Sequence, residues 1–214
     1  MVSGAFGYRV GIVAIAALVL ASATGSRAVA ADDAAICANE TGEVAIAACT
    51  RAIKSGRYSG HALATKYTNR GAEWNNKQDY DRAIADLDQA LKLDKKYADA
   101  FYNRCVSYNG KENFDRAIAD CSAAIRLGAD PSVLNATGSE RLSLDHSTSD
   151  YYSARGFAYH GEKDYDRAIA DYNQAIRLYP NRSATIKNRG LAYQAMGDMK
   201  RANADFEKAR QLGK

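Results

Sequence analysis

The stretch Asp164-Tyr-Asp-Arg-Ala-Ile-Ala-Asp-Tyr-Asn-Gln-Ala-Ile-Arg-Leu178 decides the fold of this chain. Its apolar residues fall at the spacing of one face of an amphipathic helix, namely Ala168, Ile169, Tyr172, Ala175 and Ile176. Asp79–Leu93 and Asn113–Leu127 are close copies, and Asp198–Leu212 is a looser one. The copies follow one another at steps of 34, 51 and 34 residues, and 51 is 34 plus 17. A fixed period of this size predicts a stacked array of repeats.

Each copy is preceded by another helical segment, which we call the leading helix of its unit, and three of these segments contain a central glycine. Gly71, Gly156 and Gly190 each cost up to ~1 kcal/mol relative to alanine in a helix interior. The cost is acceptable if the missing side chain lets the second helix of the unit approach closely. We expect the aligned alanines of the second helices, which are Ala83, Ala117, Ala168 and Ala202, to form the other side of that contact.

These positions resemble the tetratricopeptide repeat, a 34-residue pattern of an aromatic residue, Leu-Gly, Tyr, Ala-x3-aromatic and Pro. The third unit matches at Tyr152, Gly156, Tyr159, Ala168, Tyr172 and Pro180. The second matches at Phe101, Cys105, Tyr108, Ala117 and Cys121, and the fourth at Ile186, Gly190, Tyr193, Ala202 and Phe206. The resemblance covers about 150 residues. It implies an all-α fold, a right-handed superhelical solenoid of tetratricopeptide helix pairs, with the leading helices lining a groove.

The repeats divide the chain into five segments. We expect a signal peptide at 1–30, a degenerate N-terminal half-repeat or cap at 31–60, units 1–2 at 61–127, an inserted loop at 128–148 and units 3–4 at 149–214. The loop is predicted because Gly128 and Pro131 end a helix and the following residues are rich in Ser, Thr and Asp.

The N-terminal segment has the features of an export signal. The apolar run Val10–Ala23 follows Arg9, is too short to span a bilayer comfortably, and is followed by the small-x-small site Ala28–Ala30. We expect a periplasmic or secreted protein with no membrane span after cleavage; an uncleaved anchor is the alternative. Residues 1–30 contain two of the 29 basic residues and no acid, so the remaining 27 basic and 25 acidic residues are too balanced to indicate nucleic-acid binding.

An arginine stands before each leading-helix glycine position, where the family has leucine, and an aspartate follows sixteen residues later. The four pairs are Arg70–Asp86, Arg104–Asp120, Arg155–Asp171 and Arg189–Asp205. We interpret them as ion pairs between the two helices of each unit. The alternative is a ladder of arginines presented to an anionic ligand.

Four cysteines in an exported protein indicate disulfides first. Cys37 and Cys49 flank the turn of the N-terminal half-repeat and are expected to be bridged. Cys105 and Cys121 occupy close-packed positions of one unit, so they are either a second bridge or two buried thiols.

The sequence offers no pattern that indicates catalysis. His61, His146 and His160 are not at metal-ligand spacing from one another or from a cysteine. There is no phosphate-binding glycine loop, no nucleophile elbow and no Cys-x-x-Cys. We therefore expect no enzyme activity, no metal and no cofactor.

A groove lined by leading helices implies a protein partner that presents a peptide or a helix. The expected lining residues are Asn69, Asn75, Tyr102, Asn103, Asn109, Phe157, His160, Lys187, Asn188 and Gln194. Asparagine amides can bond a peptide backbone, and aromatic rings can anchor apolar side chains. The alternative for Asn69, Asn103 and Asn188 is a structural role.

Two other functions stay open: a self-assembling scaffold, and an accessory subunit of a cell-envelope enzyme complex. The isoleucine and leucine residues on the outer face of the earlier second helices become Asn203 and Arg210 in the last unit. Because a terminal repeat needs a polar outer face, this change favours a monomer over end-to-end stacking.

The export signal gives the first testable prediction. The mature protein should lack residues 1–30 or 1–31, so that N-terminal sequencing of the protein from its host begins at Ala31 or Asp32. A mature chain that begins at Met1 would contradict the prediction.

Overall fold

The computed structural model describes residues 32–128 and 138–213, with side chains described from residue 144 onward in the second part. Residues 32–39 are helical, and the helices that follow are α2 (Gly42–Lys54), α3 (Gly60–Asn76), α4 (Tyr80–Leu93), α5 (Ala98–Gly110), α6 (Phe114–Gly128), α8 (Gly138–Gly161), α9 (Tyr165–Leu178), α10 (Ser183–Ala195) and α11 (Met199–Leu212). No strand occurs in these two ranges. The predicted signal peptide lies outside the described residues.

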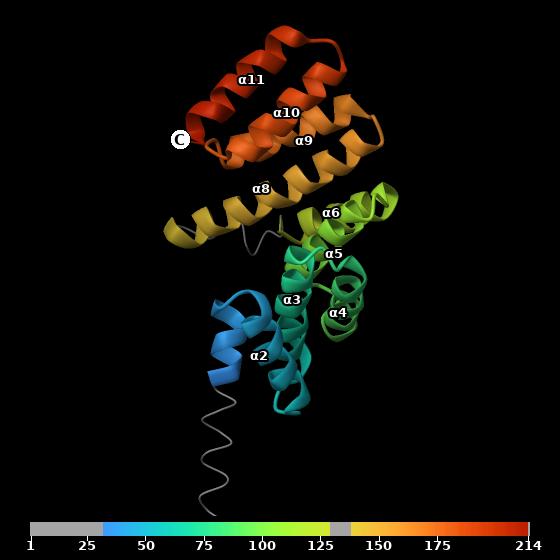
Figure 1. Ribbon diagram of the computed structural model, residues 1–214, viewed down its shortest axis with the longest axis vertical. Coiled ribbons are helices and arrows are strands. Elements are labelled where there is room, and N and C mark those ends of the chain that lie inside the picture. Colours follow the sequence, from blue (N-terminus) through green and yellow to red (C-terminus); the bar gives the residue numbers. More distant parts are fainter. Residues whose placement is uncertain (1–31, 129–137, 214) are drawn as a thin grey trace, which may run out of the picture.

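The helices form antiparallel pairs that stack along the longest axis of the molecule (Figure 1). The pairs α3–α4, α5–α6, α8–α9 and α10–α11 each place a leading helix against a second helix. The second helix of one pair also contacts the leading helix of the next, so α4 packs on α5, α6 on α8 and α9 on α10. The all-α solenoid of helix pairs predicted from the repeats is confirmed. Residues 32–54 lie at one end and α11 at the other (Figure 1).

The glycines of the leading helices stand where the paired helices approach most closely. A Cβ atom at Gly71 would lie 2.9 Å from Cγ of Leu87, and one at Gly156 would lie 2.9 Å from the Tyr172 ring. Both distances are shorter than a van der Waals contact, so only glycine fits without displacement. The predicted close approach at these glycines is therefore confirmed. The expected partner is corrected, because Leu87 and Tyr172 lie nearest and Ala83 and Ala168 contribute only carbonyl oxygens, at 3.4 and 3.2 Å.

The second unit replaces this contact with a covalent bond. Cys105 occupies the glycine position and Cys121 the position of Leu87, and their sulfur atoms form a disulfide in which both residues are fully buried. Cys37 and Cys49 form the second disulfide, which joins the helical residues 32–39 to α2. No free cysteine occurs in the described chain.

The predicted loop at 128–148 is wrong for residues 138–148, which are the first three turns of α8. This helix has 24 residues, whereas the other leading helices of complete units have 13 to 17. Its Ser and Thr side chains suggested a loop, but tertiary contacts hold this part of the helix. The His146 ring lies 4.1 Å from the Tyr179 ring, and Ser149, the residue after the predicted loop, donates to the carbonyl of Ala175 at 2.9 Å. Residues 129–137 lie outside the described range.

The structure contains no helix, within the ranges that it describes, with the length and apolar character needed to cross a bilayer.

The turns inside the four complete units place one residue in the left-handed backbone region. These residues are Gln78, Glu112, Lys163 and Gly197, with φ of 60°, 56°, 64° and 82°. The amide immediately before each second helix closes the turn, as when the N–H of Asp79 bonds the carbonyl of Trp74 at 2.9 Å. Three of the four turns therefore hold a residue with a Cβ atom where glycine is favoured.

Glycine at these three positions should stabilise the array. A non-glycine residue in this conformation costs ~1–2 kcal/mol, and the entropy of glycine in the unfolded chain offsets ~0.5–1 kcal/mol of that. Gln78→Gly, Glu112→Gly and Lys163→Gly should each raise the free energy of unfolding in urea by about 0.5–1 kcal/mol. Gly197→Ala is the matched control and should lower it. Glycine variants that melt earlier than the parent would show that these turns are not strained.

Candidate partner-binding site

The four arginines that stand before the glycine positions of the leading helices were candidates for ligand binding. The structure assigns them to the scaffold instead. In every complete unit the arginine Nε and Nη2 donate to the two carboxylate oxygens of the aspartate sixteen residues later, at 2.7–2.8 Å. The predicted pairs Arg70–Asp86, Arg104–Asp120, Arg155–Asp171 and Arg189–Asp205 are confirmed. The alternative, an open ladder of arginines, is wrong.

The third nitrogen of each guanidinium connects its unit to the preceding one. Nη1 donates to the preceding second helix, and the acceptors for Arg70, Arg104, Arg155 and Arg189 are Thr50, Asp88, Ser122 and Asn173, at 2.6–3.0 Å. In the three later units the acceptor stands two residues after the aspartate of the preceding unit. The same bond spans the insertion, because Arg155 reaches Ser122, so the extra residues leave the stacking register unchanged.

These guanidinium groups are too enclosed to serve a ligand. Their side chains are 19–21% exposed, and those of the paired aspartates are 8–10% exposed. The hydrogen bond that each arginine donates to its aspartate is the largest cause of the raised pKa of the arginine, and it outweighs the opposing effect of burial. The charge is therefore fixed and already paired.

Breaking one of these pairs should cost more stability than breaking a surface pair of the same unit. Arg155→Ala leaves Asp171 enclosed without its cation, and we expect it to lower the free energy of unfolding by about 2–4 kcal/mol. Arg167→Ala removes an exposed arginine bonded to the N-cap Asp164 and should cost about 1 kcal/mol or less. Chemical denaturation measures both.

Adding Asp171→Asn to Arg155→Ala should recover part of the loss, since the substitution removes the unpaired charge. Equal losses for the arginine variants at 155 and 167 would contradict a structural role for the enclosed pair.

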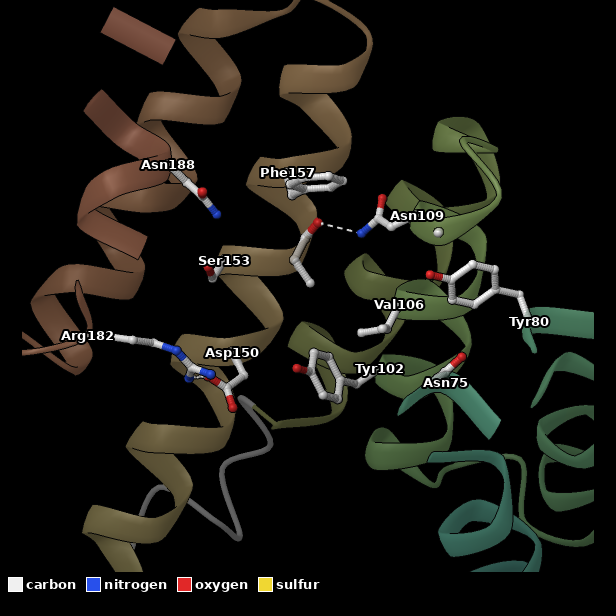
Figure 2. A pocket seen from close by; sticks show the side chains of 12 residues that line it. Asn75, Tyr80, Tyr102, Val106, Asn109, Asp150, Ser153, Phe157, Arg182 and Asn188 are labelled. Atoms are coloured by element: carbon white, nitrogen blue, oxygen red, sulfur yellow. Dashed lines mark hydrogen bonds and ion pairs between the residues drawn. The ribbon is translucent and has the colours of Figure 1, made fainter. Parts of the chain in front are cut away.

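A hollow of about 360 Å³ opens on the leading-helix side, between α5, α8 and α10 (Figure 2). We call it the concave hollow. Its lining residues are Asn75, Tyr80, Tyr102, Val106, Asn109, Gly110, Asp150, Ser153, Ala154, Phe157, Arg182 and Asn188. The structure thus brings together five of the ten predicted binding residues, namely Asn75, Tyr102, Asn109, Phe157 and Asn188.

Aromatic side chains give the concave hollow its apolar surface. Phe157 is 46% exposed, which is unusual for so large an apolar side chain, and it faces the opening from α8 (Figure 2). Tyr102 contributes the opposite wall from α5, and its ring lies 5.2 Å from that of Tyr151. Burial raises the pKa of the Tyr102 hydroxyl, so this group stays protonated at neutral pH and can donate a hydrogen bond.

Three of the predicted asparagines tie neighbouring helix pairs together through their amide nitrogens. Asn69 donates to the carbonyl of Cys37 at 3.1 Å, Asn75 to that of Asn103 at 2.9 Å, and Asn109 to that of Ala154 at 3.0 Å. Asn103 donates to Asp99 within its own helix. For Asn69 the structural alternative accounts for the side chain. Asn188 differs, because its side chain makes no hydrogen bond with another described residue and faces the hollow (Figure 2).

Besides Asn69 and Asn103, three predicted residues lie away from the concave hollow. His160 is half-buried with its ring 5.2 Å from that of Tyr165, and Gln194 is exposed. Lys187 lines a separate hollow at the C-terminal end of the array.

Several lining residues were missed by the sequence analysis. Val106 and Ser153 occupy the same repeat positions as Phe157 and Tyr102, respectively, so the period itself could have identified them.

The ion pair of Arg182 with Asp150, which joins α10 to α8, had no such signal, because Arg182 stands in the turn before α10. This pair neutralises the only two charged residues of the lining, so the hollow is apolar and amide-rich without net charge.

No group of three or more His, Cys, Asp or Glu residues suited to a metal ion occurs in residues 32–128 and 138–213.

Family models and solved structures agree with this architecture. The model of the tetratricopeptide repeat matches residues 156–212, and a second TPR repeat model matches residues 75–111. No curated protein matches the sequence.

Among solved structures, the chain is similar to MamA from Desulfovibrio magneticus RS-1, with 19% identity and a TM-score of 0.61 over 80% of this chain and 85% of that one. It is also similar to BtubC from P. vanneervenii, with 20% identity and a TM-score of 0.63 over 78% and 71%. A third is the first TPR module of Spaghetti (RPAP3), bound to the HSP90 peptide SRMEEVD, with 22% identity and a TM-score of 0.53 over 66% and 99%. The two matched segments are thus tetratricopeptide repeats, and the described chain has the fold of a tetratricopeptide array.

Proposed function

We propose that this protein is an exported interaction module that holds a segment of a partner protein in the concave hollow around Phe157. The exposure of Phe157 carries the proposal. A phenylalanine that faces an open hollow exposes apolar area to water, and a bound apolar side chain would remove that area from solvent.

The lining indicates which kind of segment fits. The only charges, Asp150 and Arg182, are paired with each other, so a charged side chain would gain no partner there. An extended segment with an aromatic or aliphatic residue would place it between Phe157 and Tyr102. The Asn188 amide and the Tyr102 hydroxyl would then be available to the backbone of the segment. We therefore propose a neutral, apolar-centred peptide segment.

A relative with the same fold supports the class of partner. The RPAP3 module was solved with the peptide SRMEEVD, which carries acidic residues near its end. The absence of an unpaired cation from the lining of the concave hollow favours a different peptide chemistry in this chain.

Export is supported by two independent features. The first thirty residues have the pattern of a cleavable signal, and the described chain contains two disulfides and no free cysteine. Because disulfides persist in oxidising compartments, we place the protein in the periplasm or outside the cell.

A peptide library displayed on phage and selected on the immobilised protein tests the binding mode. We expect enriched peptides with a central aromatic or aliphatic residue. Phe157→Ala should weaken binding of a synthetic peptide from that pool by about 1–3 kcal/mol, the range for a central anchor residue. Titration calorimetry measures the change.

Leu93→Ala is the matched control, because Leu93 is an apolar residue of similar exposure, 39%, at the end of α4 and outside the hollow. It should leave the affinity unchanged, and both variants should melt with the parent. Selected peptides that bind the Phe157 variant as tightly as the parent would refute the proposed site.

A further inference from the structure

One contact recurs where a unit meets the next, and it joins the first residue of a second helix to the end of the following leading helix. Tyr80 lies over Gly110, where a Cβ atom would be 2.2 Å from the ring, and Phe114 lies over Gly161, where the distance would be 2.3 Å. We call the large residue the knob and the small residue the socket. Tyr165, the knob of the third unit, packs against the core cluster that contains Ala192 of α10.

The series leaves one knob without a following unit. Met199 is the first residue of α11 and stands 34 residues after Tyr165, in the knob position of the fourth unit. It is 47% exposed, because no further helix pair covers it within the described chain.

The opposite end presents a socket without a knob. The sockets Gly110 and Gly161 each precede the first alanine of the second-helix phrase by seven residues, and Ala38 precedes Ala45 in the same way. The same position in the fourth unit, opposite the knob Tyr165, is Ala195, so alanine as well as glycine occupies the socket position. Ala38 is exposed on the helical segment 32–39, at the far end of the array from α11 (Figure 1).

The C-terminal end also has room for a helix. A hollow of about 520 Å³ lies between α10 and α11, lined by Ser183, Ala184, Lys187, Phe206, Ala209 and Arg210. At each earlier junction the corresponding surface of a helix pair receives the next leading helix. We call this site the end hollow.

The two ends carry opposite net charge. Residues 32–54 contain four acids and two bases, whereas Ser183–Leu212 contain six bases and three acids. Approach of one end to the other is therefore favoured over approach of like ends.

We propose that a second copy of this chain docks on the end hollow, head to tail, with Met199 of one copy against Ala38 of the next. The helical segment 32–39 of the second copy then takes the place of a fifth leading helix. Such a contact joins two different surfaces, so it repeats at each free end and builds an open chain of copies. The site is separate from the concave hollow and does not depend on the proposed function.

The strength of the junction between copies depends on Asn203 and Arg210, the two polar residues on the outer face of α11. They replace the isoleucine and leucine residues of the internal junctions, so the junction between copies buries less apolar surface than those within a copy. Association should therefore be reversible and depend on concentration.

Sedimentation equilibrium of the purified protein from about 1 to about 500 μM tests the proposal, and the weight-average mass should rise with concentration. Met199→Lys should weaken association by at least about tenfold, as expected for an anchor residue. Met196→Lys is the matched control, since Met196 is 46% exposed in the same turn. Met196 faces the preceding unit and not the free end. Lys111, which has the same repeat position in the second unit, contacts Asp81 of the first unit. The control should associate like the parent.

A mixture of two singly blocked variants tests the head-to-tail geometry. Met199→Lys retains a free socket, and Ala38→Arg retains a free knob, so at a concentration where the parent associates each variant alone should be mainly monomeric. Together they should form a one-to-one dimer and nothing larger. Both positions are exposed, and unchanged melting curves will verify that the variants fold.

Three outcomes would overturn the proposal. They are a mass that stays monomeric throughout the concentration range, a Met196 variant that associates as weakly as the Met199 variant, and a mixture of the blocked variants that contains only monomers.

Discussion

A planar guanidinium group with three bonds in fixed directions is the interaction on which this array depends. Two nitrogens hold the aspartate of the same unit and the third holds a residue of the preceding unit, so one side chain sets the geometry within and between helix pairs. Arginine suits this place because its donors form a rigid fork. Lysine would supply the charge but not the three directions.

The junctions leave the concave side free to vary. The contact of Gly156 with the Tyr172 ring, the disulfide and the enclosed ion pairs all lie between helices, so they stabilise the stack without using residues that line the concave hollow. The exposed residues of the leading helices can then differ from unit to unit at little cost in stability. Phe157 stands in such a position, equivalent to Ala72, Val106 and Leu191. A binding specificity could arise there without altering the fold.

The sequence predicted the paired arginines and the close-approach glycines correctly because each is a local, periodic feature. It predicted five of the twelve residues that line the concave hollow. Asn75 was assigned to a ligand, and Asn69 to a ligand or a structural role, but both amides bond carbonyl groups of neighbouring helix pairs. Whether a polar group faces solvent or a neighbouring backbone depends on how two units stack, and composition does not report that. The loop predicted for residues 138–148 failed for the same reason, since these residues begin α8 and the His146 ring lies against the Tyr179 ring at the end of α9.

The sequence by itself determined the repeat length, the helix pairs, the pairing of arginine with aspartate and the candidate disulfides. These follow from spacing along one chain, because a helix of fixed pitch brings residues at set intervals to one face. Only the tertiary structure decided the third bond of each arginine, the extent of α8, the residues that meet in the concave hollow and the unpartnered ends. Those features depend on how one unit stacks on the next. Packing of whole helices, rather than local spacing, sets which of them touch.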